Sequence, residues 1–61
     1  MNKEEFAKFV RTRRRKAGLI QSEFADLIGV SLMTVWRWEN EENIPAENII
    51  DMWINKIKII L

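Results

Sequence analysis

Apolar side chains recur along this chain at steps of three and four residues, which is the spacing of one helix face. The first such stripe consists of Phe6, Val10, Arg14 and Ala17, with Phe9 beside it. Asn2 followed by Glu5 has the spacing of a capping box, so a first helix is expected to begin near Lys3. Gly18 is typical of the residue that follows a helix, and residues 19–20 are then expected to turn inward.

A second and a third helix are predicted on either side of Gly29. The second spans about residues 21–28, with Phe24, Ala25 and Ile28 buried and Leu27 partly covered. Ile20 stands at its N-cap, where it offers no oxygen to the free backbone N–H groups. Ser31 is a favourable N-cap for the third helix, which runs from Leu32 to about Asn40. Its inward positions are Thr34 (in part), Val35 and Trp38, and its outward positions are Leu32, Met33, Trp36, Arg37 and Asn40.

A loop over residues 41–44 separates the third helix from a last apolar segment. Pro45 suits the first turn of a helix, because its missing N–H group is not needed there. The apolar face of this fourth helix is expected to consist of Ile49, Ile50, Trp53, Ile54 and Ile57. Residues 56–61, KIKIIL, alternate as in a strand but also continue the helical stripe. We expect helix to about residue 56, and both readings stay open beyond it.

The segment from Gln21 to Asn40 has the spacing of a helix-turn-helix. Ala25, Gly29, Val35 and Trp38 lie 4, 8, 14 and 17 positions after Gln21. These are the places for a small residue at the helix crossing, a residue tolerant of positive φ at the corner, and two core anchors. A unit of this kind presents its second helix to the major groove of DNA.

Composition limits the chain of 61 residues to one small domain. Without cysteine or histidine, no disulfide, nucleophile–base pair or ordinary zinc site can be assembled, so we expect no enzyme, metal or cofactor. The 48% apolar content, with three Trp and three Phe, favours a packed core. It also suggests that some apolar surface is kept for another subunit. We expect no small-molecule substrate.

Charge is distributed unevenly, although the formal net charge is only +1. Five cations occupy six positions at the end of the first helix: Arg11, Arg13, Arg14, Arg15 and Lys16. Two interpretations stay open, phosphate contact and a solvated helix end that complements the helix dipole. The charged amino terminus and the absence of a long apolar run predict no signal peptide, no membrane span and no membrane partner. We therefore expect a cytoplasmic protein of a bacterium, or of a host cell if a phage encodes it.

The chain resembles the Cro/C1-type helix-turn-helix family of phage repressors and bacterial regulators. The resemblance covers about residues 6–57 and is carried by R-x-x-x-G-L (14–19), Gln21, F-A-x-x-I-G-V-S (24–31), T-V-x-R-W-E (34–39) and Pro45. It implies an all-α, lambda-repressor-like domain of four or five helices spanning residues 1–61. It further implies sequence-specific binding to duplex DNA, usually by a homodimer on a palindromic operator.

The candidate base-reading residues lie on the outward side of the third helix: Leu32, Met33, Trp36 and Arg37. The Arg37 guanidinium can bind guanine O6 and N7, whereas the alternative is an ion pair with Glu41. Leu32 and Met33 depart from the polar residues usual in the family. They could pack on the methyl groups of thymines, or the same surface could meet a protein.

The candidate phosphate-contacting residues are Gln21, Ser31, Thr34, Asn40 and Arg13. Gln21 opens the second helix, whose N-terminus itself favours anions. The resemblance also implies a partly buried ion pair between Arg14 and Glu39 that sets the angle of the third helix. The family normally has glycine and then basic residues where this chain has Glu41 and Glu42, which predicts strain and repulsion of phosphate.

The carboxyl end, residues 57–61, is a candidate dimerisation tail because a small core cannot cover all of its apolar residues. The candidate interface residues are Ile57, Ile59, Ile60 and Leu61. The function that we expect is a transcriptional regulator, a repressor that occupies an operator. The alternative is a protein-interaction module that uses the same apolar face, and salt dependence of binding would separate the two.

Overall fold

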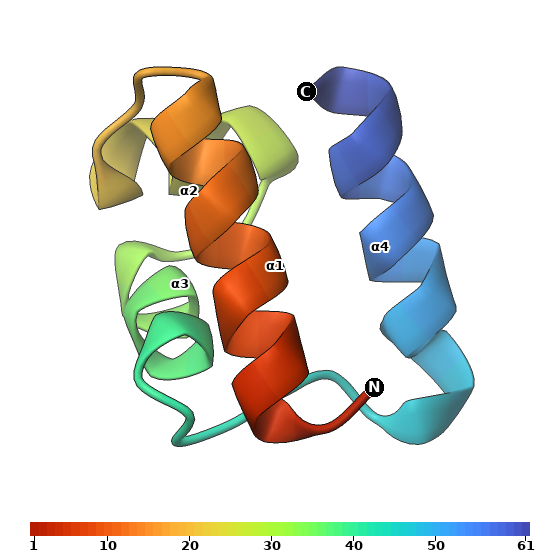
Figure 1. The fold of residues 1–61 in the computed structure, drawn as a ribbon. Helices are drawn as coiled ribbons and strands as arrows, with labels where there is room; N and C mark the ends of the chain where they lie inside the picture. Colours follow the sequence, from red (N-terminus) through yellow and green to blue (C-terminus); the bar gives the residue numbers. More distant parts are fainter.

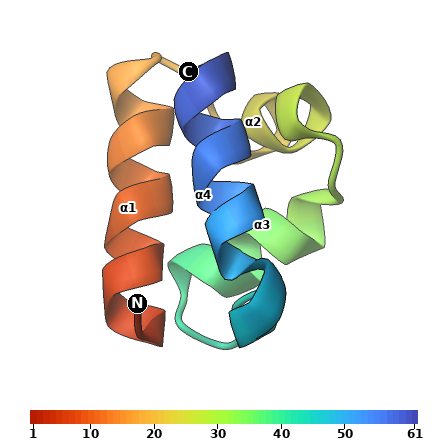
Figure 2. The same ribbon diagram turned by 90° about the vertical axis from the view of Figure 1, so that its right-hand side faces the viewer.

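The computed structural model describes residues 1–61 and contains four helices and no strand. The helices are α1 (Lys3–Lys16), α2 (Gln21–Ile28), α3 (Leu32–Glu39) and α4 (Glu47–Ile60). Helices α1 and α4 lie side by side and run in the same direction, and the α2–α3 pair packs across them (Figures 1 and 2). The all-α prediction is therefore confirmed, with four helices.

The first helix begins as its capping residues predict. The Asn2 side chain accepts a hydrogen bond from the backbone N–H of Glu5 at 2.8 Å, and the Glu5 carboxylate accepts one from the N–H of Asn2 at 2.9 Å. The helix stops at Gly18, whose φ of 73° places it in the left-handed region. Ala17 is its C-cap and is exposed, so its expected place on the buried stripe is wrong.

The start of α2 lacks a side-chain cap at Ile20, as the sequence predicts. Half of a capping box remains, because the Glu23 carboxylate accepts a hydrogen bond from the N–H of Ile20 at 2.9 Å. The Ile20 side chain is 62% exposed, so the expectation that it turns inward is wrong, whereas Leu19 does pack against the core. Leu27, expected to be partly covered, is 49% exposed.

The corner between α2 and α3 is formed by Gly29, with a φ of 81°. A Cβ atom at this position would meet only the Lys56 Nζ, at 3.9 Å, so the backbone angle rather than space favours glycine. Ala25 is buried, and its carbonyl accepts hydrogen bonds from the N–H groups of Gly29 and Val30. The corner therefore has the helix-turn-helix geometry that the spacing predicts.

Trp38 lies at the centre of the core. Its ring meets Phe6 of α1 edge-on at a centroid distance of 5.2 Å, and Trp53 of α4 at 5.5 Å. The buried cluster consists of Phe6, Val10, Phe24, Ala25, Ile28, Val35, Trp38, Ile50 and Ile57. Trp38 thus fixes α3 to α1 and α4, and its prediction as a core residue is confirmed.

The fourth helix starts later and ends later than the sequence predicts. Pro45 precedes the N-cap residue Ala46, whose extended backbone delays the first helical residue to Glu47, so the placement of Pro45 in the first turn is wrong. The helix continues to Ile60, which answers the open question of residues 56–61 in favour of helix. No helix of the structure is long and apolar enough to cross a bilayer.

Because the tail is helical, it buries some of the apolar residues that the sequence suggested as dimer contacts and leaves others exposed. Ile57 is fully buried in the core, so it is not available as a dimer contact, whereas Leu61 packs against the core and stays partly exposed. Ile59 is 84% exposed and Ile60 is 37% exposed. The apolar residues that α4 leaves exposed, here named the α4 stripe, are Ile49, Met52, Ile59 and Ile60.

Candidate nucleic-acid interface

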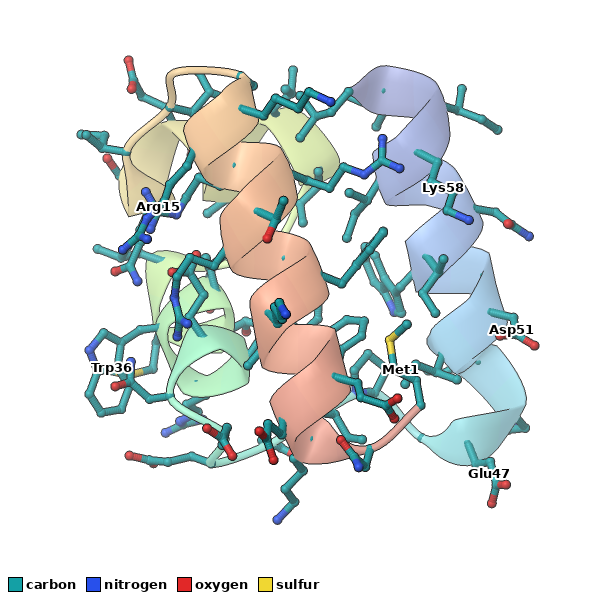
Figure 3. All side chains as sticks on the ribbon, in the orientation of Figure 1. Met1, Arg15, Trp36, Glu47, Asp51 and Lys58 are labelled. Atoms are coloured by element: carbon teal, nitrogen blue, oxygen red, sulfur yellow. The ribbon has the colours of Figure 1, made fainter.

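The outward side of α3 is exposed as the sequence predicts. Leu32, Met33 and Trp36 keep 50%, 53% and 40% of their surface exposed, while Val35 and Trp38 hold the opposite side in the core. Trp36 projects from the side of the molecule opposite Asp51 and Lys58 of α4 (Figure 3). Arg37 is exposed and forms no ion pair, so the alternative pairing with Glu41 is not found.

The N-termini of α2 and α3 meet at a shallow apolar groove of about 530 Å³. This groove, here named the α3 groove, is lined by Gln21, Ser31, Leu32, Met33 and Trp36. The last three of these residues are hydrophobic and the first two are polar. The groove lies on the first turn of α3, the part of a recognition helix that approaches base edges most closely.

The N-cap of α3 leaves one hydroxyl proton free. Ser31 Oγ accepts a hydrogen bond from the N–H of Thr34 at 3.1 Å, and it lies 2.9 Å from Thr34 Oγ1. The two hydroxyls have two protons between them, of which one makes their mutual bond. Whichever hydroxyl donates in that bond, the proton of the other hydroxyl can be donated to an external acceptor such as a phosphate oxygen.

Two side-chain amides on this side also have free donors. The half-buried Gln21 amide makes no hydrogen bond within the protein, and it stands at the first residue of α2. Asn40 uses one amide proton on the carbonyl of Trp36, at 2.8 Å, and keeps the other. Both amides can therefore donate to an anion at the ends of α2 and α3.

The predicted ion pair between Arg14 and Glu39 is present and bidentate. Arg14 Nε lies 2.6 Å from Glu39 Oε2, and Arg14 Nη2 lies 2.9 Å from Oε1. A third bond joins Arg14 Nη1 to the carbonyl of Leu19 at 3.0 Å. The hydrogen bond with the 3% exposed Glu39 raises the pKa of Arg14 above its ordinary value, so the arginine side of the pair stays charged through the physiological range.

Arg11 is a partner of Glu39 that the sequence analysis missed. Its Nη2 donates to the main-chain oxygen of Glu39, and its Nε lies 3.8 Å from the Glu39 carboxylate. The signal was present in the spacing, because Arg11 precedes Arg14 by three residues and so shares its side of α1. Together the two arginines hold both the side chain and the backbone of the last residue of α3.

A family model described as helix-turn-helix matches residues 10–57. This chain belongs to the Cro/C1-type helix-turn-helix family. No curated protein and no solved structure matched it. The family is one of DNA-binding helix-turn-helix regulators and is typically not enzymatic.

Arg13 and Arg15 lie on different sides of this helix-turn-helix protein. The Arg13 guanidinium carbon lies 5.5 Å from the Phe9 ring centroid, and Arg13 shares a hollow with Leu61 at the end of α4. Arg15 projects to the same side as Trp36 (Figure 3). The structure therefore does not bring Arg13 to the α3 surface, because its position on α1 faces α4. Arg15 is a cation of the same run that does project to the side of Trp36 (Figure 3).

Glu41 occupies the place of the glycine that usually ends the recognition helix of the helix-turn-helix family. Its φ is 60°, and the N–H of Glu42 bonds to the carbonyl of Arg37 at 3.0 Å, as in a Schellman motif. Glu41 shares a hollow of about 410 Å³ with three cations of α1: Lys8, Arg11 and Arg15. These cations partly offset the charge of an acidic loop that would otherwise repel phosphate.

Proposed function

We propose that this protein is a sequence-specific transcriptional repressor that inserts α3 into the major groove of duplex DNA. The observation that carries the proposal is the contrast between the two sides of α3. One side is fixed by Val35, Trp38 and the two arginines on Glu39, and the other is free in solvent. A helix held rigidly from behind can read base edges without first being ordered.

Arg37 is the proposed residue for direct readout of a guanine. It is exposed, unpaired and one turn beyond Met33, and a guanidinium fork binds guanine O6 and N7 together. Leu32 and Met33 have no polar group, so their proposed role is to pack on thymine methyl groups. Trp36 is exposed on the same side of α3 and is the fourth proposed base-reading residue.

Phosphate contacts are proposed for the free donors around α3. These are the Gln21 amide, one hydroxyl of the Ser31–Thr34 pair, the remaining Asn40 amide proton and the Arg15 guanidinium. The N-terminus of α2 adds its partial positive charge beside Gln21. Such contacts fix the position of the protein on the duplex but do not select its sequence.

A homodimer on a palindromic operator is proposed from the α4 stripe. Single exposed apolar residues are common on protein surfaces, but four along one helix indicate an interaction surface. A second copy of the chain would cover them. Two copies related by a two-fold axis would present two α3 helices to half-sites separated by one helical turn. Repression would then follow from occupation of the operator.

The decisive experiment is selection of bound duplexes from a random DNA pool, followed by titration of the selected duplex at increasing salt. A repressor should enrich a palindrome, and its affinity should fall linearly on logarithmic scales as salt rises. The second candidate, a protein-interaction module, is favoured by the apolar walls of the α3 groove. That candidate predicts no enriched duplex and a protein complex that salt weakens little.

A further inference from the structure

The α3 groove offers few hydrogen-bonding groups to a ligand. Its walls are the side chains of Leu32, Met33 and Trp36, and the indole N–H is the one polar group among them. Gln21 and Ser31 complete the lining, and they contribute the free Gln21 amide and at most one free hydroxyl proton of the Ser31–Thr34 pair. The group that best fits these walls is therefore apolar.

A base pair presents one apolar group in the major groove, the methyl group on C5 of thymine. A methylated cytosine has its methyl group at the same ring position. We infer that the α3 groove is a binding site for pyrimidine C5-methyl groups, so that 5-methylcytosine is favoured over cytosine there. This inference rests on the proposed insertion of α3 into DNA, and it adds cytosine methylation as a signal that operator binding would detect.

The surroundings of the groove favour methylated DNA over an apolar partner protein. The N-termini of α2 and α3 border it, and helix N-termini favour anions. Arg37 follows the groove residue Trp36 in the sequence and forms no ion pair. Arg15 projects to the same side of the molecule as Trp36 (Figure 3). The α3 groove thus combines apolar walls, which suit a methyl group, with nearby positive charge, which suits the phosphates of DNA.

The groove is also larger than one methyl group, at about 530 Å³. It can therefore hold the methyl groups of neighbouring pyrimidines. Each methyl group removed from water on binding should tighten the complex by about fourfold. Since Leu32 and Met33 reach the groove from successive positions of α3, each should affect a different base step.

The test starts from the duplex enriched by selection and changes single methyl groups. Replacing each thymine by uracil removes the C5-methyl group and leaves every hydrogen-bonding group in place. We expect about fourfold weaker binding at one or two adjacent positions and no change elsewhere. At those same positions a duplex with cytosine should bind about fourfold tighter when the cytosine carries a C5-methyl group.

Leu27 provides a matched control for Leu32. The two leucines are 49% and 50% exposed, but Leu27 lies on α2 outside the groove. In Leu32→Ala the ratio of thymine to uracil affinities should approach one at one base step, and in Leu27→Ala it should keep its full value. Circular dichroism and binding to random duplex, both unchanged, would show that each variant is folded.

Three outcomes would overturn the inference, and they differ in what they say of DNA binding. If the pool yields no enriched duplex, the proposed function fails and the inference with it. If a duplex is enriched but uracil and unmethylated cytosine change nothing, DNA binding stands and the methyl site does not exist. If methyl effects persist undiminished in both Leu32→Ala and Met33→Ala, the methyl groups bind outside the α3 groove.

Discussion

Arg11 on α1 donates a hydrogen bond to the main-chain oxygen of Glu39, the last residue of α3. Carbonyls at the end of a helix have no partner within the helix, so this bond satisfies one of them from outside. Arg14, one turn later, binds the carboxylate of the same residue. The orientation of α3 therefore depends on α1 through two arginines and one nearly buried glutamate.

Replacing Arg14 by alanine should destabilise the fold strongly. Glu39 is 3% exposed, and without Arg14 its carboxylate would keep only the more distant Arg11, at 3.8 Å. Leaving one charge of a buried pair without its partner costs about 3–5 kcal/mol. The free energy of unfolding from urea titration checks this. Arg15→Ala is the control, because Arg15 forms no ion pair, and equal effects of the two substitutions would contradict the prediction.

Arg11→Ala should weaken operator binding more than binding to random duplex. The lost hydrogen bond should lower the free energy of unfolding by about 1 kcal/mol, and the end of α3 would no longer be fixed to α1. Misplaced base contacts lower specific affinity, whereas phosphate contacts tolerate small shifts. Affinities for the two DNAs, measured side by side, give the ratio. Lys8→Ala, from the same hollow but without a contact to Glu39, should leave that ratio unchanged.

Local signals predicted the helix-turn-helix unit well, because each one acts within a few residues. The Asn2–Glu5 capping box, the Ser31 N-cap and the positive φ of Gly29 are all determined by short stretches of chain. The geometry of the corner then determines which side of α3 is buried. The faces of α2 and α3 could therefore be assigned from their spacing alone.

The errors that concern the candidate interfaces occurred where side-chain direction depends on distant elements. The cluster of cations predicted phosphate contact, but the sequence did not distinguish Arg13, which faces α4, from Arg15 on the α3 side. Ile57 and Ile59 both suggested a dimer surface, and only the packing of α4 separates the buried residue from the exposed one. Periodicity assigns residues to a face but does not reveal which neighbour covers it.

Glu41→Gly should raise the free energy of unfolding. Glu41 has a φ of 60°, and a side chain in the left-handed region costs about 1 kcal/mol that glycine avoids. Part of this gain is offset by the greater freedom of glycine in the unfolded chain. Urea titration provides the measurement. Glu42→Gly removes the same charge at a residue without positive φ, so a similar gain there would mean that charge, not backbone strain, explains the effect.

Trp36 fluorescence should change when the protein binds its operator. Trp36 is 40% exposed on the α3 groove, whereas Trp38 is 4% exposed and Trp53 packs against the core. Contact with DNA would change the surroundings of the first indole and leave the other two as they are. In Trp36→Phe the response to operator should disappear while the emission of the folded core remains. A full response in that variant would place the DNA contact away from α3.

Substitutions at Ile57 and Ile59 should separate the core of α4 from its exposed stripe. Ile59→Glu places a charge on a residue that is 84% exposed, so the fold should persist while the proposed dimer dissociates. Ile57→Ala removes fully buried methyl groups and should cost about 2–5 kcal/mol of unfolding free energy. Sedimentation measures the first effect and urea titration the second. Lys58→Glu, on the neighbouring residue, introduces the same carboxylate outside the α4 stripe and should leave the dimer intact. A dimer unchanged in Ile59→Glu would mean that the two copies meet on another surface.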